Sequence, residues 1–303
     1  MIDGSWRGIL PTIMLRVVSV ALIALVACKQ PDAASSPPPP PPKSAVEVVA
    51  PGSEPRTQLR YQLRKGATSD VVFALDMDMT AGTRDVKMPT LELAVTIRVE
   101  DVLADGTAAL RFTYNAVEAK DRDGATVPAR VLSEQAAALT GAAVTGKLSP
   151  TGAFSEVALV ATPKLAGALG DQVKQLTQSV EQVAMPLPAQ PVGIGAVWKA
   201  KKIINQNGMT LVTTTTVSLT SRDGSKLGFT TKASVEGANQ TVMQNGVETN
   251  VSGLAGSGDG QGTLDLATLA LAEQLATKLD ATVRALGETA PMHLAIAMRV
   301  APR

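Results

Sequence analysis

The chain has little cysteine and histidine, since Cys28 and His293 are the only residues of these types among 303. A single thiol excludes a disulfide within the chain, so stability has to come from the core. A zinc or copper site at His293 would need a second histidine or a free cysteine, and the chain supplies neither. We therefore expect no metal and no cofactor. His293 is expected to be a surface or hydrogen-bonded side chain rather than a catalytic base.

Aromatic residues form only 3% of the chain, and the charges nearly cancel. The core must be built from aliphatic side chains and methionine, and aromatic stacking platforms for bases or sugars are not expected. Residues 1–27 contain Arg7, Arg16 and Asp3, so without that segment the 28 basic and 27 acidic residues become 26 of each. A neutral chain has no basic field for nucleic acid, and we expect no nucleic-acid partner.

The usual signatures of catalysis are also missing. Apart from glycine-rich near misses, the sequence has no Gly-x-Ser-x-Gly nucleophile elbow. The glycine-rich run 253–262 lacks the Lys-Ser/Thr ending of a phosphate-binding loop. We interpret this run as a flexible or bulged connection between strands. No catalytic residue is expected, and we expect the protein not to be an enzyme.

The run Asp76-Met77-Asp78-Met79 is the remaining candidate for a site. In a strand the two aspartates share one face and the two methionines share the other. The carboxylates could bind Ca²⁺ or act as acid and base, and the thioethers could hold Cu(I). Both sites need further ligands, so we favour methionines in the core and solvated aspartates.

The N-terminal region has the organisation of a secretory signal. The ten residues 17–26 are mostly apolar, and they follow the basic Arg16 and precede the small Ala27. This core is too short to span a bilayer, which needs about 20 apolar residues. We predict a signal peptide at 1–27. Met14-Leu15-Arg16 is a more usual start for a signal than residues 1–13, so we hypothesise that translation begins at Met14 rather than Met1.

The sequence Leu25-Val26-Ala27-Cys28 resembles the lipobox of bacterial prolipoproteins. The resemblance implies that Cys28 is the lipidation site, carrying acyl chains such as palmitate that attach the protein to a membrane. Lys29 stands where an inner-membrane retention signal in enteric bacteria has aspartate. This favours an outer-membrane lipoprotein of the cell envelope, with its folded part in the periplasm or at the surface.

Residues 28–55 are predicted to form a disordered, proline-rich tether. The six consecutive prolines 37–42 adopt polyproline II at about 3.1 Å per residue, which gives a stiff spacer of roughly 19 Å. A proline-recognition ligand for a partner is the alternative interpretation. We favour a spacer that lifts a globular domain, residues 56–303, away from the membrane.

Alternating apolar residues and paired turn residues predict antiparallel hairpins in that domain. Residues 91–117 alternate on both sides of Asp105-Gly106, and residues 211–235 do so around Asp223-Gly224. Similar signals occur at 123–124, 207–208, 245–246 and 259–260. The two hairpins have similar lengths, so the domain could consist of two similar halves, about 56–160 and 190–303.

Helical periodicity is confined to two segments. Apolar residues recur every three or four positions over about 163–184, which predicts an amphipathic helix. A shorter helix is predicted at about 129–140, with Gly141 as its stop. Residues 271–286 fit a helix or a strand, and we favour the strand although Glu273 and Thr277 would share its apolar face. The fold class is therefore α+β and predominantly antiparallel β.

Two short glycine-rich segments, Gly193–Trp198 and Gly256–Leu266, resemble sequence motifs of uncharacterised β-rich bacterial lipoprotein domains. That family brings no known activity. The expected architecture, a large curved sheet or half-barrel of hairpins, is similar to that of lipoprotein carriers. We expect a non-catalytic binding or envelope-structural domain. The alternative is a carrier of lipid or another hydrophobic ligand in a concave cavity of several hundred Å³ between the sheet and helix 163–184.

Overall fold

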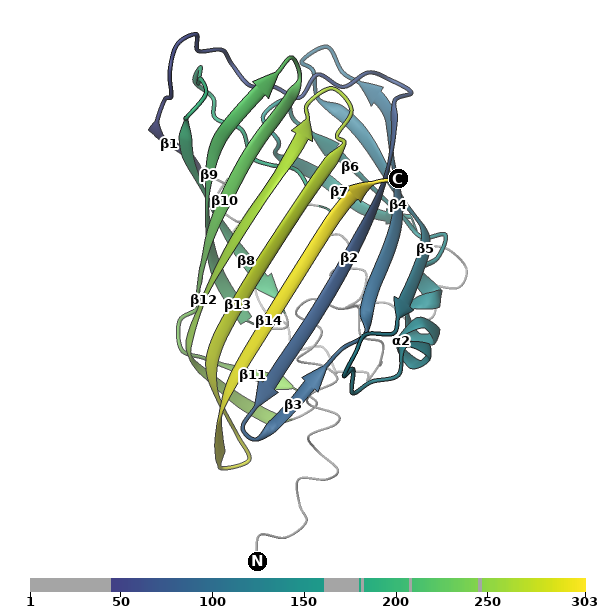
Figure 1. Cartoon of the computed structure of the whole chain (residues 1–303), viewed down its shortest axis with the longest axis vertical. Helices are drawn as coiled ribbons and strands as arrows, with labels where there is room; N and C mark the ends of the chain where they lie inside the picture. The colour runs from purple at the N-terminus through teal and green to yellow at the C-terminus, as the bar shows by residue number, and fades with distance from the viewer. Residues whose placement is uncertain (1–44, 161–179, 181–182, 207–208, 245–246) are drawn as a thin grey trace, which may run out of the picture.

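A computed structural model describes residues 45–160, 180, 183–206, 209–244 and 247–303. The described chain is dominated by one sheet of 14 strands in which every pairing is antiparallel. Figure 1 shows long, tilted strands that coil around the vertical axis, so that the sheet has a concave inner face and a convex outer face. The predicted fold class, α+β with a large curved antiparallel sheet, is confirmed.

The sheet is built from two runs of neighbouring strands joined by one non-local pairing. The first run contains β1 (Ala45–Ala50), β8 (Val197–Gln206), β9 (Met209–Asp223), β10 (Lys226–Glu236), β12 (Val247–Asp265), β13 (Leu271–Ala285) and β14 (Glu288–Pro302). The second run contains β2 (Thr68–Ala81), β4 (Thr90–Val102), β5 (Ala108–Lys120), β6 (Ala143–Leu148) and β7 (Phe154–Val160). Pairing of β14 with β2 joins the two runs. The short strands β3 (Arg84–Lys87) and β11 (Gln240–Gln244) pair with β2 and β12.

The two runs form one continuous sheet, and the first run includes β1, which lies outside both predicted halves. Both predicted hairpins are present, as β4–β5 and β9–β10. The preferred interpretation of residues 271–286 is confirmed, because β13 covers Leu271–Ala285. Residues 207–208 and 245–246, where two further turns were predicted, lie outside the described residues.

The short helix is confirmed as α2 (Ala129–Ala136), continued by a 3₁₀ turn at Ala137–Leu139. Gly141 has a φ of +85°, the left-handed conformation that ends helices with glycine. The helix packs beside β5, where the Ser133 hydroxyl accepts a hydrogen bond from the Ala119 N–H at 2.9 Å (Figure 1). Among the described helices, none has both the length and the apolar character to cross a membrane.

Three predictions about local structure are wrong. Residues 45–50 of the predicted tether form strand β1, and the Ser53 N–H donates to the Ile194 carbonyl at 2.9 Å, so order begins before residue 56. Asp259-Gly260 is not a turn but lies in the middle of β12. The glycine-rich run is a continuous strand with a bulge between Ser252 and Ala255, rather than a connection between strands.

Glycines face inward along β12. Ideal Cβ atoms at Gly256, Gly258, Gly260 and Gly262 would all lie closer than 3.0 Å to atoms of the neighbouring strands. At Gly256 the contact is with a Leu279 methyl group at 2.3 Å, and at Gly262 it is with the Ala272 carbonyl oxygen at 2.3 Å. Side chains from β10 and β13 therefore cover the glycines, and this strip lets the sheet coil tightly.

One end of the coiled sheet, which we call the closed end, is covered by connecting chain. It contains the turns at 103–107, 149–153, 223–225 and 266–270. The Tyr61 N–H donates to the Pro150 carbonyl, and the Gln62 N–H donates to the Leu266 carbonyl, both at 2.9 Å. Leu59 and Trp198 are fully buried here, and the Trp198 indole N–H donates to the Pro186 carbonyl at 2.9 Å. Segment 56–66 thus closes this end of the concave face.

Candidate functional site

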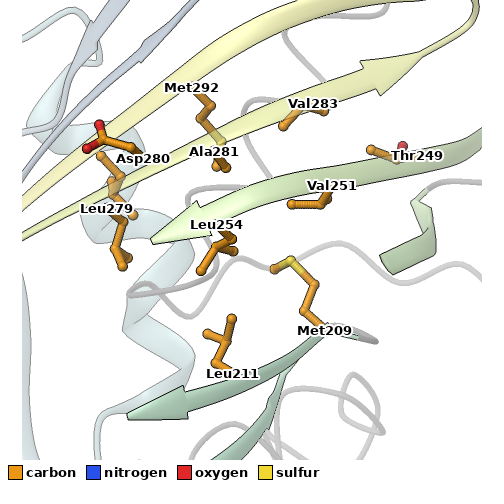
Figure 2. A pocket seen from close by; sticks show the side chains of 11 residues that line it. Met209, Leu211, Thr249, Val251, Leu254, Leu279, Asp280, Ala281, Val283 and Met292 are labelled. Atoms are coloured by element: carbon orange, nitrogen blue, oxygen red, sulfur yellow. The ribbon is translucent and has the colours of Figure 1, made fainter. Parts of the chain in front are cut away.

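An apolar pocket lies at the opposite end of the concave face, which we call the pocket end. This end contains the turn at 286–287 and the segment 237–243. Four strands, β9, β12, β13 and β14, supply the pocket lining (Figure 2). The lining residues are Met209, Leu211, Thr249, Val251, Leu254, Leu279, Asp280, Ala281, Val283, Met292 and Leu294.

The chemistry of this lining is almost entirely aliphatic and thioether. Asp280 contributes little polarity, because Figure 2 shows its carboxylate pointing away from the other lining side chains. That carboxylate contacts His293 Nδ1 at 2.5 Å. Thr249 is 1% exposed, and its hydroxyl donates to the Val247 carbonyl at 3.5 Å. A water molecule needs two to four polar partners, so the lining favours an apolar occupant over water.

The pocket is lined mainly by the smaller of two clusters of core residues. The larger cluster fills the closed end and the centre, and a smaller one gathers around Met209, Val242 and Val251. Leu279 and Met292 are half-buried and contact both clusters. The alternation of the strands explains this arrangement, since odd residues of β13 and even residues of β14 face inward.

The free space in the pocket is about 40 Å³. On this scale one water needs about 10–15 Å³, so the pocket has room for roughly three groups of methylene size. Burying three methylenes contributes about 2 kcal/mol, at about 0.8 kcal/mol each. Association of a free ligand costs at least about 4 kcal/mol in lost freedom. The pocket can therefore hold the end of an alkyl chain but cannot by itself retain a freely diffusing ligand.

A half-buried carboxyl group lies elsewhere on the concave face. Glu273 of β13 is paired between Gly262 of β12 and Val300 of β14. Desolvation by burial raises the pKa of Glu273 above its ordinary value. Glu273 was expected to disfavour a strand at 271–286, yet the strand forms, and burial destabilises the ionised form of its carboxyl group.

Replacement of Glu273 by glutamine is expected to stabilise the protein at pH 7 and to have little effect at pH 4. The raised pKa means that the folded state binds a proton more tightly than the unfolded state. The contribution of the Glu273 carboxyl group to the free energy of unfolding is therefore fully present below the ordinary pKa of glutamate. It is lost as pH rises through the pKa that this group has in the folded state. Urea unfolding of both proteins between pH 4 and pH 8 measures the difference. Glu100→Gln, at an exposed position on β4, is the matched control, and an equal pH dependence in all three proteins would contradict the expectation.

The Asp76-Met77-Asp78-Met79 run has the predicted division between faces. Met77 and Met79 are 1% and 3% exposed in the core. The aspartates on the outer face are not simply solvated, because Arg122 donates two hydrogen bonds to Asp78 at 2.8 and 3.0 Å. Asp76 accepts a hydrogen bond from Thr90 at 2.5 Å, and its other oxygen lies 3.5 Å from Arg299. Arginine partners thus occupy the face on which a cation would have to bind.

His293 lies on the exposed side of β14, where it pairs with Asp280, and the prediction of a surface, hydrogen-bonded histidine is confirmed. Among the described residues, no group of three or more His, Cys, Asp and Glu side chains could hold a metal ion. Cys28 lies outside the described residues. The helix predicted at 163–184 also lies outside them, except that Val180 is helical and residues 183 and 184 are in a turn and a bend.

None of the pocket residues was predicted to form a site. Apolar alternation was recognised at 211–235, and a strand was favoured for 271–286, whereas the glycine-rich part of β12 was predicted to be a connection. Alternation alone does not distinguish a filled core from a pocket. A usable signal was the concentration of methionine near strand ends, at Met209 and Met292, because flexible thioethers fill irregular space.

Comparison with known proteins gives one family match. Residues 165–268 match the model of a family of unknown function, DUF6263. Both glycine-rich segments, Gly193–Trp198 and Gly256–Leu266, lie inside this range, which is consistent with the resemblance to an uncharacterised family. No curated protein matches the chain.

One solved structure similar to this chain is an outer membrane channel from Pseudomonas putida F1. The sequences are 11% identical, and the alignment covers 79% of this chain and 97% of that chain, with a TM-score of 0.13. A TM-score this low does not establish a shared fold.

Proposed function

We propose that the protein is a lipid-anchored, non-catalytic binding protein of the bacterial cell envelope, held in the outer membrane through Cys28. The observation that carries the binding role is the aliphatic pocket at one end of a concave sheet whose other end is closed. Convex-face positions such as Lys199, Lys232 and Lys278 are exposed, as expected for a domain that stands in water on a tether.

The anchor part of the proposal depends on the thiol of Cys28. Replacement of Cys28 by serine is expected to abolish incorporation of radiolabelled palmitate and to release the protein from the membrane fraction. The reason is that only the thiol can form the thioether to diacylglycerol, and several acyl chains are needed for stable attachment. Membrane flotation and palmitate labelling measure both effects. Ser36→Ala in the tether is the matched control, and a Cys28→Ser protein that still floats with membranes would contradict the anchor.

The pocket also bears on the alternative function, a carrier that shelters a whole lipid. Ligand sites for such molecules have volumes of about 300–1,000 Å³, whereas the described pocket has about 40 Å³ of free space. This difference favours binding of a chain end over carriage. The cavity expected beside helix 163–184 lies outside the described residues, so mass spectrometry of lipid extracted from the purified protein distinguishes the two. Stoichiometric lipid in that extract would favour the carrier.

A further inference from the structure

The first strand determines the direction from which the chain enters the domain. β1 is antiparallel to β8, with Ala45 opposite Lys201 and Ala50 opposite Val197. β8 begins at the closed end and runs toward the pocket end, so Ala45 is the end of β1 that lies nearer the pocket end. From Lys201 to the last residue of β8, Gln206, is a distance of about 17 Å at roughly 3.3 Å per residue.

The tether is long enough to pass the rim of the pocket end. Sixteen residues, 29–44, connect Cys28 to β1, and an extended chain of this length spans up to about 55 Å. To place the closed end against the membrane, the tether would have to reverse direction and run back along β1. The geometry therefore favours a membrane beneath the pocket end.

The rim of the pocket end presents the two most exposed large apolar side chains of the described residues. Met243 of β11 is 59% exposed, and Leu286 in the β13–β14 turn is 60% exposed. Both side chains lie beside the start of β12. Met243 is paired with Glu248 of β12, and Ala285, the residue before Leu286, is paired with Thr249 of β12. Two strand spacings separate them, about 10 Å. Single exposed apolar residues are ordinary, but two beside an aliphatic pocket mark a surface for an apolar partner.

Charged residues at this rim do not form a field of one sign. The exposed Glu248 lies between Met243 and Leu286, and the exposed Arg284 and Glu288 lie two residues before and two residues after Leu286. These two carboxylates and one guanidinium can remain at the level of lipid headgroups while the apolar side chains enter below them. Leu286 has a φ of +52° and precedes Gly287 at +85°, so it projects from a tight two-residue turn.

We propose that the pocket end faces the membrane, that Met243 and Leu286 enter the lipid interface, and that the aliphatic pocket receives the end of an acyl chain from a membrane lipid. The inference rests on the proposed lipid anchor at Cys28. It also explains how a pocket with a small binding free energy can be occupied, because a lipid that is already held in the adjoining membrane does not have to be captured from solution.

Depth measurements on the anchored, full-length protein test the orientation. Leu286→Cys and Leu103→Cys place a single free thiol at an exposed apolar turn residue of the pocket end and of the closed end, since lipidation blocks Cys28. Each thiol is labelled with an environment-sensitive fluorophore in vesicles of phosphatidylethanolamine and phosphatidylglycerol. Lipids brominated on their acyl chains are expected to quench the label at position 286 several-fold more than the label at 103. Equal quenching, or stronger quenching at 103, would overturn the orientation.

A second measurement tests the acyl chain in the pocket. A phospholipid with a photoreactive diazirine at the end of one acyl chain is added to the same vesicles, and labelled peptides are identified by mass spectrometry. Labelling is expected at peptides containing Leu211 or Met292, and Ala281→Leu, which fills the pocket, is expected to reduce it several-fold. Labelling that persists in a folded Ala281→Leu protein would overturn the pocket assignment. Protein that fails to float with the vesicles would instead contradict the anchor at Cys28, and the inference with it.

Discussion

Replacement of Trp198 by alanine is expected to lower the free energy of unfolding by about 3–5 kcal/mol, the range for removing a large aromatic side chain from a core. Trp198 is fully buried on β8 at the closed end. Its ring leaves a large cavity when truncated, and the loss of the indole N–H leaves the half-buried Pro186 carbonyl without its donor at 2.9 Å. Because this hydrogen bond holds the segment around Pro186 against the sheet, the closed end loses both packing and a hydrogen bond between segments.

Urea unfolding followed by far-ultraviolet circular dichroism measures this effect without relying on tryptophan fluorescence. Trp198→Phe keeps most of the ring but loses the hydrogen bond, and we expect a cost of about 1–3 kcal/mol for that variant. Val49→Ala on the adjacent β1 is the matched control, because Val49 is 54% exposed. A loss below 1 kcal/mol in Trp198→Ala would show that the closed end does not depend on this side chain.

Replacement of Gly262 by alanine is expected to cost about 2–3 kcal/mol, at the upper end of the usual range for overpacking. An added Cβ would lie 2.3 Å from the Ala272 carbonyl oxygen and 2.9 Å from the Phe229 ring. The carbonyl belongs to the neighbouring strand β13, so it cannot withdraw without disturbing the pairing of β12 with β13. This differs from a clash with a flexible side chain, which can rotate away.

Ser257→Ala is the matched control for Gly262→Ala, because Ser257 is exposed on the other face of the same strand. We expect its effect to stay within about 0.5 kcal/mol, as for most surface substitutions. Thermal or urea unfolding of the two variants gives the comparison. Equal stability would show that β12 can move outward, and that the glycine strip does not control the curvature of the sheet.

The glycine strip illustrates both what the sequence contains and how it can be misinterpreted. Gly256, Gly258, Gly260 and Gly262 recur with a period of two, which is the period of one face of a strand. The Asp259-Gly260 pair suggested a turn, but the period of two indicated a strand interior. A pair of turn residues is a local signal, whereas the alternation extends over seven residues, and the structure has a strand there.

Much of the candidate site could not be predicted from the sequence. Strands β9 and β13 of the pocket were predicted, the glycine-rich part of β12 was predicted to be a connection, and His293 was correctly expected at the surface. The pocket itself depends on how β9, β12, β13 and β14 end relative to one another across a coiled sheet. Glu273 shows the same limit, because its position in the pattern was clear but its burial depends on the neighbours that β12 and β14 supply.

The sequence by itself determined the alternating strands, the hairpins at Asp105-Gly106 and Asp223-Gly224, the short helix ending at Gly141 and the expectation of an anchor at Cys28. These features depend on the chemistry of residues that are close together in the chain. Only the tertiary structure decided that β14 pairs with β2, that β1 returns to β8, and that one end of the sheet is closed while the other keeps an apolar pocket. Those pairings join segments separated by more than a hundred residues, where backbone hydrogen bonding is the same for any strand and only the packing of the whole sheet selects the partner.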